Sequence, residues 1–225
     1  MTWAMLFDLE GTLVQTPWED SEHVLEFRLQ TRRKLIELAI PPSMLERIER
    51  STLMRDKASE YVKKNFSKTD AQKFREEMTR FLEEYELDAA RNSKLFPETL
   101  LTLEELKKQG TKMGLVANTS REAVDIVFQL HGLDKYFDVI ITREDVENLK
   151  PDPEGILLAI KRLCAKNFIM VGFLVLDFLA AKNANGISII VKRNPVEEAD
   201  RQADYFVQSL SEVPSTVQNV MRNGS

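Results

Sequence analysis

The strongest constraint on the fold is the regular alternation of short apolar segments with helical segments beyond Leu95. The expected strands are 112–117, 137–142, 168–173, 188–192 and 205–207, and the expected helices are 97–108, 120–131, 153–163, 176–184 and one from about 214. An earlier strand and turn are expected in residues 1–14. Strands joined through helices pair in parallel by right-handed crossovers, with helices on both faces of the sheet. The sequence therefore predicts an α/β fold with a doubly wound parallel sheet.

A second region, residues 21–85, differs in composition and in the spacing of its apolar residues. It contains no glycine, its charges are dense, and apolar residues such as Val24, Phe27, Leu35 and Leu38 recur at helical spacing. We expect a run of helices without strands, inserted after the first strand. The expected core domain is residues 1–14 with 93–225, and the expected helical cap subdomain is residues 15–92. Such an insertion is a natural lid for a site at the end of the first strand.

Composition excludes several classes of protein. The chain has 225 residues, 43% of them hydrophobic and 30% charged, and a net charge of −5. No basic stripe indicates nucleic-acid binding, and no apolar stretch approaches the length of a membrane span. The single cysteine, Cys164, excludes an internal disulfide and fits a reducing compartment, and its apolar neighbours suggest a buried thiol. These features favour a cytoplasmic protein.

Two carboxylates at the end of the first strand mark a candidate site. Asp8 and Glu10 occupy alternate positions, so they share one face of an extended segment, and Gly11 allows a sharp turn after them. A carboxylate nucleophile beside a second carboxyl group suits phosphoryl transfer, although a buried strand followed by an acidic turn explains the same residues. Asn118 and Phe173 also follow expected strands, and ligand sites in such sheets lie beyond the carboxyl ends of the strands.

Four segments in order resemble the motifs of the haloacid dehalogenase (HAD) superfamily. They are AMLFDLEGTLV at 4–14, MGLVANTS at 113–120, LKPDPE at 149–154 and MVGFLVLDFLAAKNANG at 170–186. The resemblance covers nearly the whole chain and is to the phosphoglycolate-phosphatase-like branch, which has a Rossmann-like core and a helical cap. It implies that Asp8 attacks phosphorus and binds Mg²⁺. It also implies that Glu10 is the acid/base and binds the metal, and that Lys150 neutralises charge.

The chain departs from the family pattern at three chemically central places. Glu10 stands where the family has Asp, and Ala117 stands where it has a hydroxyl residue. In the fourth motif, Phe173 and Leu174 replace Asp and Ser, whereas Asp177 is retained as the remaining metal-side carboxylate. The second and fourth of the four motifs are therefore degenerate, and the expected Mg²⁺ site is weakened.

The expected substrate contacts are Gly11, Asn118 and Thr119. Thr119 or Ser120 is positioned to replace the donor lost at position 117, because both begin a helix whose N-terminus can meet an anion. An ordinary N-cap is the competing interpretation of both residues.

Three functional hypotheses follow. The first is Mg²⁺-dependent hydrolysis of a small phosphorylated metabolite, a phosphomonoester, through an aspartyl-phosphate on Asp8, with weak activity. The second is a catalytically impaired HAD-fold protein that acts as a phospho-ligand sensor or an interaction module. The third is 2-haloacid dehalogenation, which needs no Mg²⁺, but the serine expected at position 117 and the polar pattern expected after Gly172 are missing.

Overall fold

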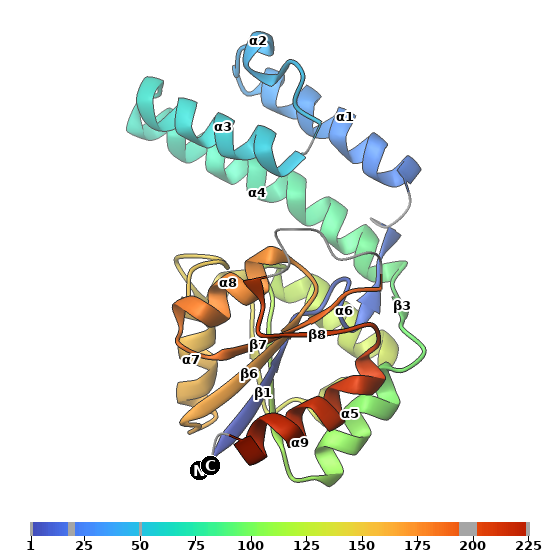
Figure 1. Cartoon of the computed structure of the whole chain (residues 1–225). Coiled ribbons are helices and arrows are strands. Elements are labelled where there is room, and N and C mark those ends of the chain that lie inside the picture. Colours follow the sequence, from blue (N-terminus) through green and yellow to red (C-terminus); the bar gives the residue numbers. More distant parts are fainter. Residues whose placement is uncertain (1, 18–20, 50, 194–201, 224–225) are drawn as a thin grey trace. The chain divides into compact units, whose positions relative to one another are not determined.

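A computed structural model of the chain describes residues 2–17, 21–49, 51–193 and 202–223. The chain divides into two compact units (Figure 1), residues 1–16 with 90–225 and residues 17–89. The domain boundaries expected from the sequence, after residues 14 and 92, differ from these by a few residues.

The larger unit is built on a six-stranded sheet in which every pairing is parallel, with the order β5-β4-β1-β6-β7-β8. The strands are β1 (Trp3–Phe7), β4 (Lys112–Val116), β5 (Val139–Ile141), β6 (Asn167–Gly172), β7 (Ile187–Val191) and β8 (Tyr205–Val207). This topology confirms the predicted parallel α/β fold, with strand ends shifted by at most two residues. A second, two-stranded sheet, which the sequence did not indicate, pairs β2 (Val14–Gln15) with β3 (Lys94–Leu95).

Helices follow the strands as predicted. They are α5 (Thr99–Lys108), α6 (Arg121–His131), α7 (Glu154–Arg162), α8 (Val175–Asn183) and α9 (Val213–Asn223), with short 3-10 turns η2 (Asp134–Tyr136), η3 (Arg143–Asp145) and η5 (Leu210–Glu212). The ends of α6 match the expected signals. Ser120 accepts a hydrogen bond from the Ala123 amide as N-cap, and Gly132 ends the helix in the left-handed conformation.

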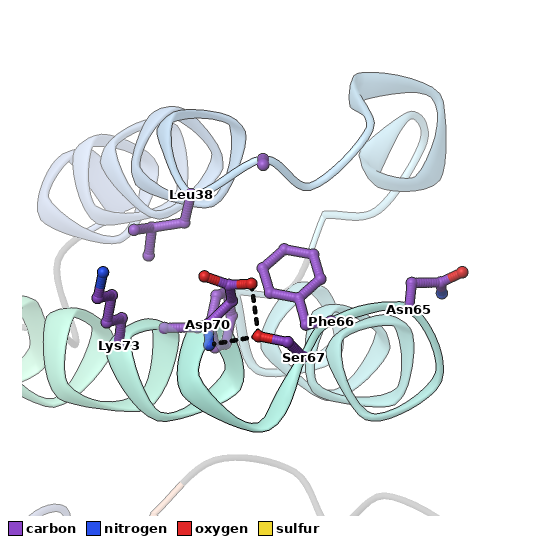
Figure 2. Close-up of a pocket in the computed structure, with 8 residues that line it drawn as sticks. Leu38, Asn65, Phe66, Ser67, Asp70 and Lys73 are labelled. Atoms are coloured by element: carbon purple, nitrogen blue, oxygen red, sulfur yellow. Dashed lines mark hydrogen bonds between the residues drawn. The ribbon is translucent and has the colours of Figure 1, made fainter.

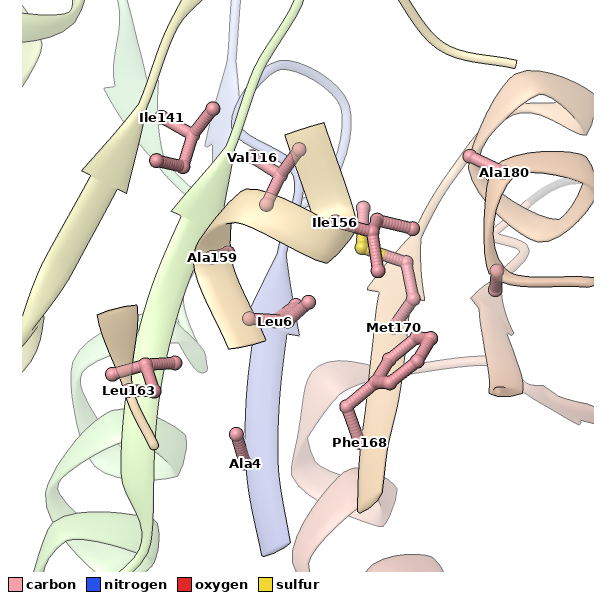
Figure 3. Packing of buried hydrophobic residues seen from close by; sticks show 11 residues of the cluster. Ala4, Leu6, Val116, Ile141, Ile156, Ala159, Leu163, Phe168, Met170 and Ala180 are labelled. Carbon is pink, nitrogen blue, oxygen red and sulfur yellow. The ribbon is translucent and has the colours of Figure 1, made fainter. Parts of the chain in front are cut away.

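Both faces of the sheet are covered, because alternate residues of β1 point to opposite sides. Ala4 and Leu6 join one apolar cluster with residues from β4, β5, β6, α7 and α8 (Figure 3), namely Val116, Ile141, Ile156, Ala159, Leu163, Phe168, Met170, Ala180 and Ala181. On the other side, the ring of Phe7 meets Phe137 edge-on at 6.0 Å, and Phe137 contacts Phe128 of α6 at 5.3 Å. The sheet is therefore doubly wound, as predicted.

Among its described residues, the smaller unit contains helices and no strand, as predicted for the insertion. Its helices are α1 (Ser21–Glu37), α2 (Pro42–Leu45), α3 (Ser51–Asn65) and α4 (Lys68–Arg91), the last of which runs into the larger unit. They enclose a separate core of Leu35, Ile40, Leu45, Ile48, Met54, Ala58, Val62, Phe74 and Met78. An ion pair of 2.9 Å between Lys34 and Glu77 links α1 to α4. The unit therefore has its own core, and its role as a cap stays a prediction.

Cys164 is exposed, so the prediction of a buried thiol was wrong. The residue follows the last turn of α7 with a positive φ of 52°, in the bend that leads to β6. None of the helices formed by the described residues is long and apolar enough to cross a membrane.

Candidate active site

The candidate site lies at the carboxyl edge of the sheet, where neighbouring strands β4, β1, β6 and β7 end. Asp8 is the first residue after β1, and its amide still donates to the Val171 carbonyl of β6 at 3.0 Å. Ala117 follows β4 and donates in the same way to Ile141 of β5 at 3.0 Å. The parallel ladder therefore fixes the start of each loop, which positions the side chains that follow.

Lys150 brings two carboxylates together. Its Nζ lies 2.7 Å from Oδ1 of Asp8 and 2.7 Å from Oδ1 of Asp177, and the three side chains are 4%, 12% and 2% exposed. Asn118 holds the backbone of the lysine, because it donates to the Lys150 carbonyl at 3.1 Å and accepts from the Lys150 amide at 3.0 Å. Three segments remote in sequence thus form one charged cluster, called the Lys150 triad below: Asp8, Lys150 and Asp177.

The Lys150 triad has one more negative charge than positive charge. Burial and then the neighbouring Asp177 raise the pKa of Asp8 from 3.8 to about 6, against the lowering effect of Lys150. Burial alone lowers the pKa of Lys150, but the charges and hydrogen bonds of Asp177 and Asp8 outweigh it and raise that pKa above its usual range. The ammonium therefore stays charged, while the pKa of Asp8 lies well above its ordinary value.

Asp177 has a structural task in addition to its ion pair. Its Oδ2 accepts hydrogen bonds from the amides of Phe173 at 3.0 Å and Leu174 at 2.9 Å, at the start of α8. A carboxylate at this place also suits the positive end of the helix dipole. Both oxygens of Asp177 are thus occupied, one by the helix start and one by Lys150, and its role as a metal-side carboxylate stays a prediction.

Two threonines approach the carboxylates of the first loop. Oγ1 of Thr119 lies 3.4 Å from Oε1 of Glu10, and Oγ1 of Thr12 lies 3.4 Å from Oδ2 of Asp8. Both are long hydrogen bonds. Thr119 thus faces the second carboxylate of the site, whereas its neighbour Ser120 serves as the N-cap of α6. Thr12 was not singled out from the sequence, although it follows Gly11 directly.

Phe173 packs against the turn that carries Glu10. Gly11 has a φ of +73°, and a Cβ atom on it would come within 2.5 Å of Cδ1 of Phe173. The position therefore needs glycine both for its backbone conformation and for the space that the ring occupies. Nζ of Lys192, just after β7, lies 5.6 Å from the centroid of the same ring.

Arg193 is a residue of this edge that the sequence did not reveal. Its guanidinium donates to the Gly11 carbonyl at 2.8 Å and to the Thr12 carbonyl at 3.3 Å, and it pairs with Glu98 at 3.1 Å. It also stacks on the Phe96 ring, 3.4 Å from the centroid. Arg193 therefore fixes the turn after β1. A Lys-Arg pair at the end of an apolar strand was the visible signal, but Gly11 and Thr12, to which Arg193 donates, lie 182 and 181 residues away in the sequence.

The side chains around Asp8 do not suit Mg²⁺, which demands oxygen ligands in near-octahedral geometry. Position 173 offers a phenyl ring, Asp177 has both oxygens in hydrogen bonds, and Oδ1 of Asp8 contacts an ammonium. Within the described ranges, no three His, Cys, Asp or Glu side chains gather as a metal site. The ligand set implied by the family pattern is therefore incomplete here.

A pocket of about 380 Å³ lies within the helical unit (Figure 2), lined by Leu38, Ala39, Asn65, Phe66, Ser67, Asp70, Lys73 and Phe74. Two of its polar side chains, Ser67 and Asp70, bond to each other. Oγ of Ser67 accepts from the Asp70 amide at 3.1 Å and donates to the Asp70 carboxylate at 2.6 Å, which caps the start of α4. The pocket therefore contains the cap of α4, and none of the residues predicted for the site line it.

Comparisons with known proteins identify the family of the chain. Residues 5–191 match the family model described as haloacid dehalogenase-like hydrolase. The chain is 30% identical to pyrophosphatase PpaX of Bacillus cereus, over 97% of this chain and 98% of that protein. Among solved structures, a haloacid dehalogenase-like hydrolase from Bacteroides fragilis superposes with a TM-score of 0.67 at 28% identity, covering 95% of this chain and 100% of the other. A predicted phosphoglycolate phosphatase from Haemophilus somnus shares the fold, with a TM-score of 0.64 at 18% identity and coverage of 95% and 97%. The chain belongs to the haloacid dehalogenase-like hydrolases.

Proposed function

We propose that this chain is a phosphatase that hydrolyses a small phosphomonoester through an aspartyl-phosphate on Asp8. The observation that carries the proposal is the ion pair of 2.7 Å between Lys150 and Asp8. It joins a buried carboxylate at a strand end to a cation that stabilises the charged, nucleophilic form. The name of the family, a hydrolase, and the similarity to a pyrophosphatase support the same class of reaction.

In the first step, an oxygen of Asp8 attacks phosphorus and the ester oxygen leaves with the bonding electron pair. Oδ2 is the better candidate for the attacking atom, because its contact with Thr12 is 3.4 Å long, whereas Oδ1 is 2.7 Å from the ammonium. Glu10 gives its proton to the leaving oxygen, so that an alcohol departs. Lys150 offsets the negative charge gathered around the phosphoryl group.

In the second step, a water molecule attacks the aspartyl-phosphate, Glu10 takes the proton of the water, and Asp8 is regenerated with release of inorganic phosphate. Glu10 thus acts first as an acid and then as a base, and it ends the cycle in the protonation state in which it started. Its side chain is one methylene longer than the aspartate of the family pattern, and its contact with Thr119 orients the carboxyl group.

The experiment that tests the proposal is hydrolysis of p-nitrophenyl phosphate and of inorganic pyrophosphate, with millimolar Mg²⁺ and with EDTA, beside Asp8→Asn. Pyrophosphate is included because the Bacillus cereus relative is named for it. We expect turnover of p-nitrophenyl phosphate by the wild type and a loss of at least about a hundredfold in the mutant, because the amide is not a nucleophile. Equal rates in both proteins would reject the proposal.

A second candidate function is a HAD-fold protein that binds a phosphorylated ligand without turning it over. It is favoured by the packing of Phe173 on Gly11, which places carbon where the family pattern has a carboxylate. The absence of a hydroxyl at Ala117 adds to it, since loss of one preorganised donor costs about 3 kcal/mol in a transition state. Binding of inorganic phosphate without any turnover would support this candidate.

A further inference from the structure

We propose that Arg193 is a positioning residue for acid catalysis, which holds the turn that carries Glu10 and leaves Asp8 to other contacts. The proposal rests on the proposed function for the role of Glu10 as the acid that protonates the leaving oxygen. It goes beyond that function because it adds a residue outside the four motifs. It also predicts that substrates depend on Arg193 according to how much their leaving group needs a proton.

The turn after β1 is bonded within itself through its amides. The carbonyl of Leu9 accepts hydrogen bonds from the amides of Leu13 at 2.8 Å and Val14 at 3.2 Å. The amide of Gly11 donates to the carbonyl of Val14 at 2.8 Å. The carbonyls of Gly11, Thr12 and Leu13 accept from groups outside the turn, so these three bonds fix its place in the larger unit.

Arg193 binds two of these three carbonyls. Its guanidinium donates through Nη1 to the Gly11 carbonyl at 2.8 Å and through Nη2 to the Thr12 carbonyl at 3.3 Å. The third carbonyl, of Leu13, accepts from the hydroxyl of Thr99 at 2.7 Å. Since Gly11 directly follows the proposed acid in the sequence, Arg193 holds the backbone next to that acid.

Arg193 is itself held by two residues that precede α5. Its Nη2 pairs with Oε1 of Glu98 at 3.1 Å, and the same oxygen accepts from the Leu210 amide at 3.4 Å. The guanidinium carbon lies 3.4 Å from the centroid of the Phe96 ring. A planar guanidinium that stacks on a ring and donates to several oxygens has no equivalent in lysine. The contact is therefore specific to arginine.

The nucleophile is held by different contacts. The amide of Asp8 donates to the Val171 carbonyl of β6 at 3.0 Å, and its side chain pairs with Lys150 at 2.7 Å. Loss of the Arg193 side chain would therefore release the acid while the nucleophile keeps its partners. A general acid works only within hydrogen-bond reach of the leaving oxygen, and a displacement of about 1 Å can cost about a hundredfold in rate.

The test compares two substrates of the full chain: phenyl phosphate, and p-nitrophenyl phosphate, whose leaving oxygen is the weaker base and needs a proton less. We expect Arg193→Met to lower kcat/KM at least about tenfold for phenyl phosphate and less than about threefold for p-nitrophenyl phosphate. Glu10→Gln should show the same pattern with a larger effect. Arg193→Lys should recover only part of the loss, and Glu98→Gln, which keeps the arginine, should have an intermediate effect.

The matched control is Arg222→Met, which changes an exposed arginine on α9 of the same unit and should match the wild type with both substrates. Hydrogen exchange of the Gly11 amide tests the contact without turnover, because an amide in a loosened turn exchanges faster. We expect exchange at least about tenfold faster in Arg193→Met and unchanged in Arg222→Met. Circular dichroism and urea unfolding check that all variants fold.

Three results would overturn the proposal: unchanged exchange of the Gly11 amide in Arg193→Met, unchanged kcat/KM for phenyl phosphate, or equal losses for the two substrates. Turnover by the wild type with unchanged exchange would keep the proposed function and reject the role of Arg193. No turnover by the wild type would reject the proposed function and the acid role of Glu10 with it. Faster exchange would then still show that Arg193 holds the turn.

Discussion

The charged groups on the two sides of the sheet edge have different kinds of partners. On the lysine side, which is the Lys150 triad with Asn118, charged atoms are buried and meet at 2.7 Å. On the phenylalanine side, which is Phe173, Gly11, Lys192 and Arg193, a ring fills the space beside a glycine. There Arg193 contacts carbonyl oxygens, the Phe96 ring and the Glu98 carboxylate, and Lys192 contacts the Phe173 ring.

The difference shows what one substitution does to its surroundings. Compared with the aspartate of the family pattern, the phenyl ring at position 173 leaves the edge with one negative charge fewer. Less positive charge is therefore needed to balance the carboxylates that remain. Asp177 then serves the helix start and the ammonium with its two oxygens. On the lysine side, both carboxylate oxygens of Asp177 therefore have hydrogen-bond donors within the protein. On the other side, the ammonium of Lys192 contacts the ring of Phe173.

The largest effect is expected from breaking the lysine side with Lys150→Met. Two carboxylates would stay buried without a cation, and removal of one partner of a buried ion pair costs about 3–5 kcal/mol of stability. Urea unfolding at neutral pH measures the loss. Adding Asp8→Asn to Lys150→Met should recover part of it, because one uncompensated charge is removed. A loss below about 1 kcal/mol, similar to that of the exposed control Lys182→Met, would contradict the comparison.

A smaller effect is expected from converting the phenylalanine side with Phe173→Asp. The half-buried ring would leave space on Gly11, so we expect a loss of about 1–2 kcal/mol in the free energy of unfolding. The new carboxylate would stand near Asp8, and we expect binding of Mn²⁺, followed by electron paramagnetic resonance, at least about tenfold tighter than in the wild type. Phe173→Asn is the matched control of similar size without charge. Equally tight Mn²⁺ binding by wild type and Phe173→Asp would show that the ring does not exclude the ion.

Much of the fold could be predicted from the sequence because local signals carry it. Alternating strands and helices dictate a parallel sheet, and the cap signals at Ser120 and Gly132 fixed the ends of α6. The strand-end rule also predicted that Asp8, Asn118 and Phe173 belong to one edge. The two-stranded sheet of β2 and β3 escaped detection because two-residue strands have no periodicity to detect.

The contacts of the site could not be read in the same way. Nothing local to Arg193 says that it donates to Gly11 and Thr12, since such contacts depend on which loops the sheet brings together. The sequence indicated that Phe173 removes a ligand, but its packing on Gly11 and its contact with Lys192 required the structure. Likewise, Asp177 was predicted from a motif as a metal-side residue, and only the geometry revealed that its oxygens hold Lys150 and the start of α8.

The smallest effect is expected on the pH at which Asp8 loses its proton, which gives the lysine side its second negative charge. Burial and then Asp177 raise the pKa of Asp8 to about 6, so the folded protein keeps a proton that the unfolded chain loses near its ordinary pKa of 3.8. The contribution of Asp8 to stability is therefore complete below about pH 4 and is lost as the pH rises through about 6. Asp177→Asn removes the second of these causes and keeps the burial, so the pKa of Asp8 should fall. The loss of stability should then finish at lower pH.

Carbon-13 NMR of the Asp8 carboxyl group follows the titration directly, with urea unfolding across the same range. Under the proposed mechanism Asp8 attacks phosphorus as the carboxylate, so the acidic limb of kcat/KM for p-nitrophenyl phosphate should move with it. An Asp8 titration that stays near 6 in Asp177→Asn would mean that burial alone raises the pKa, and that the two carboxylates interact only through Lys150.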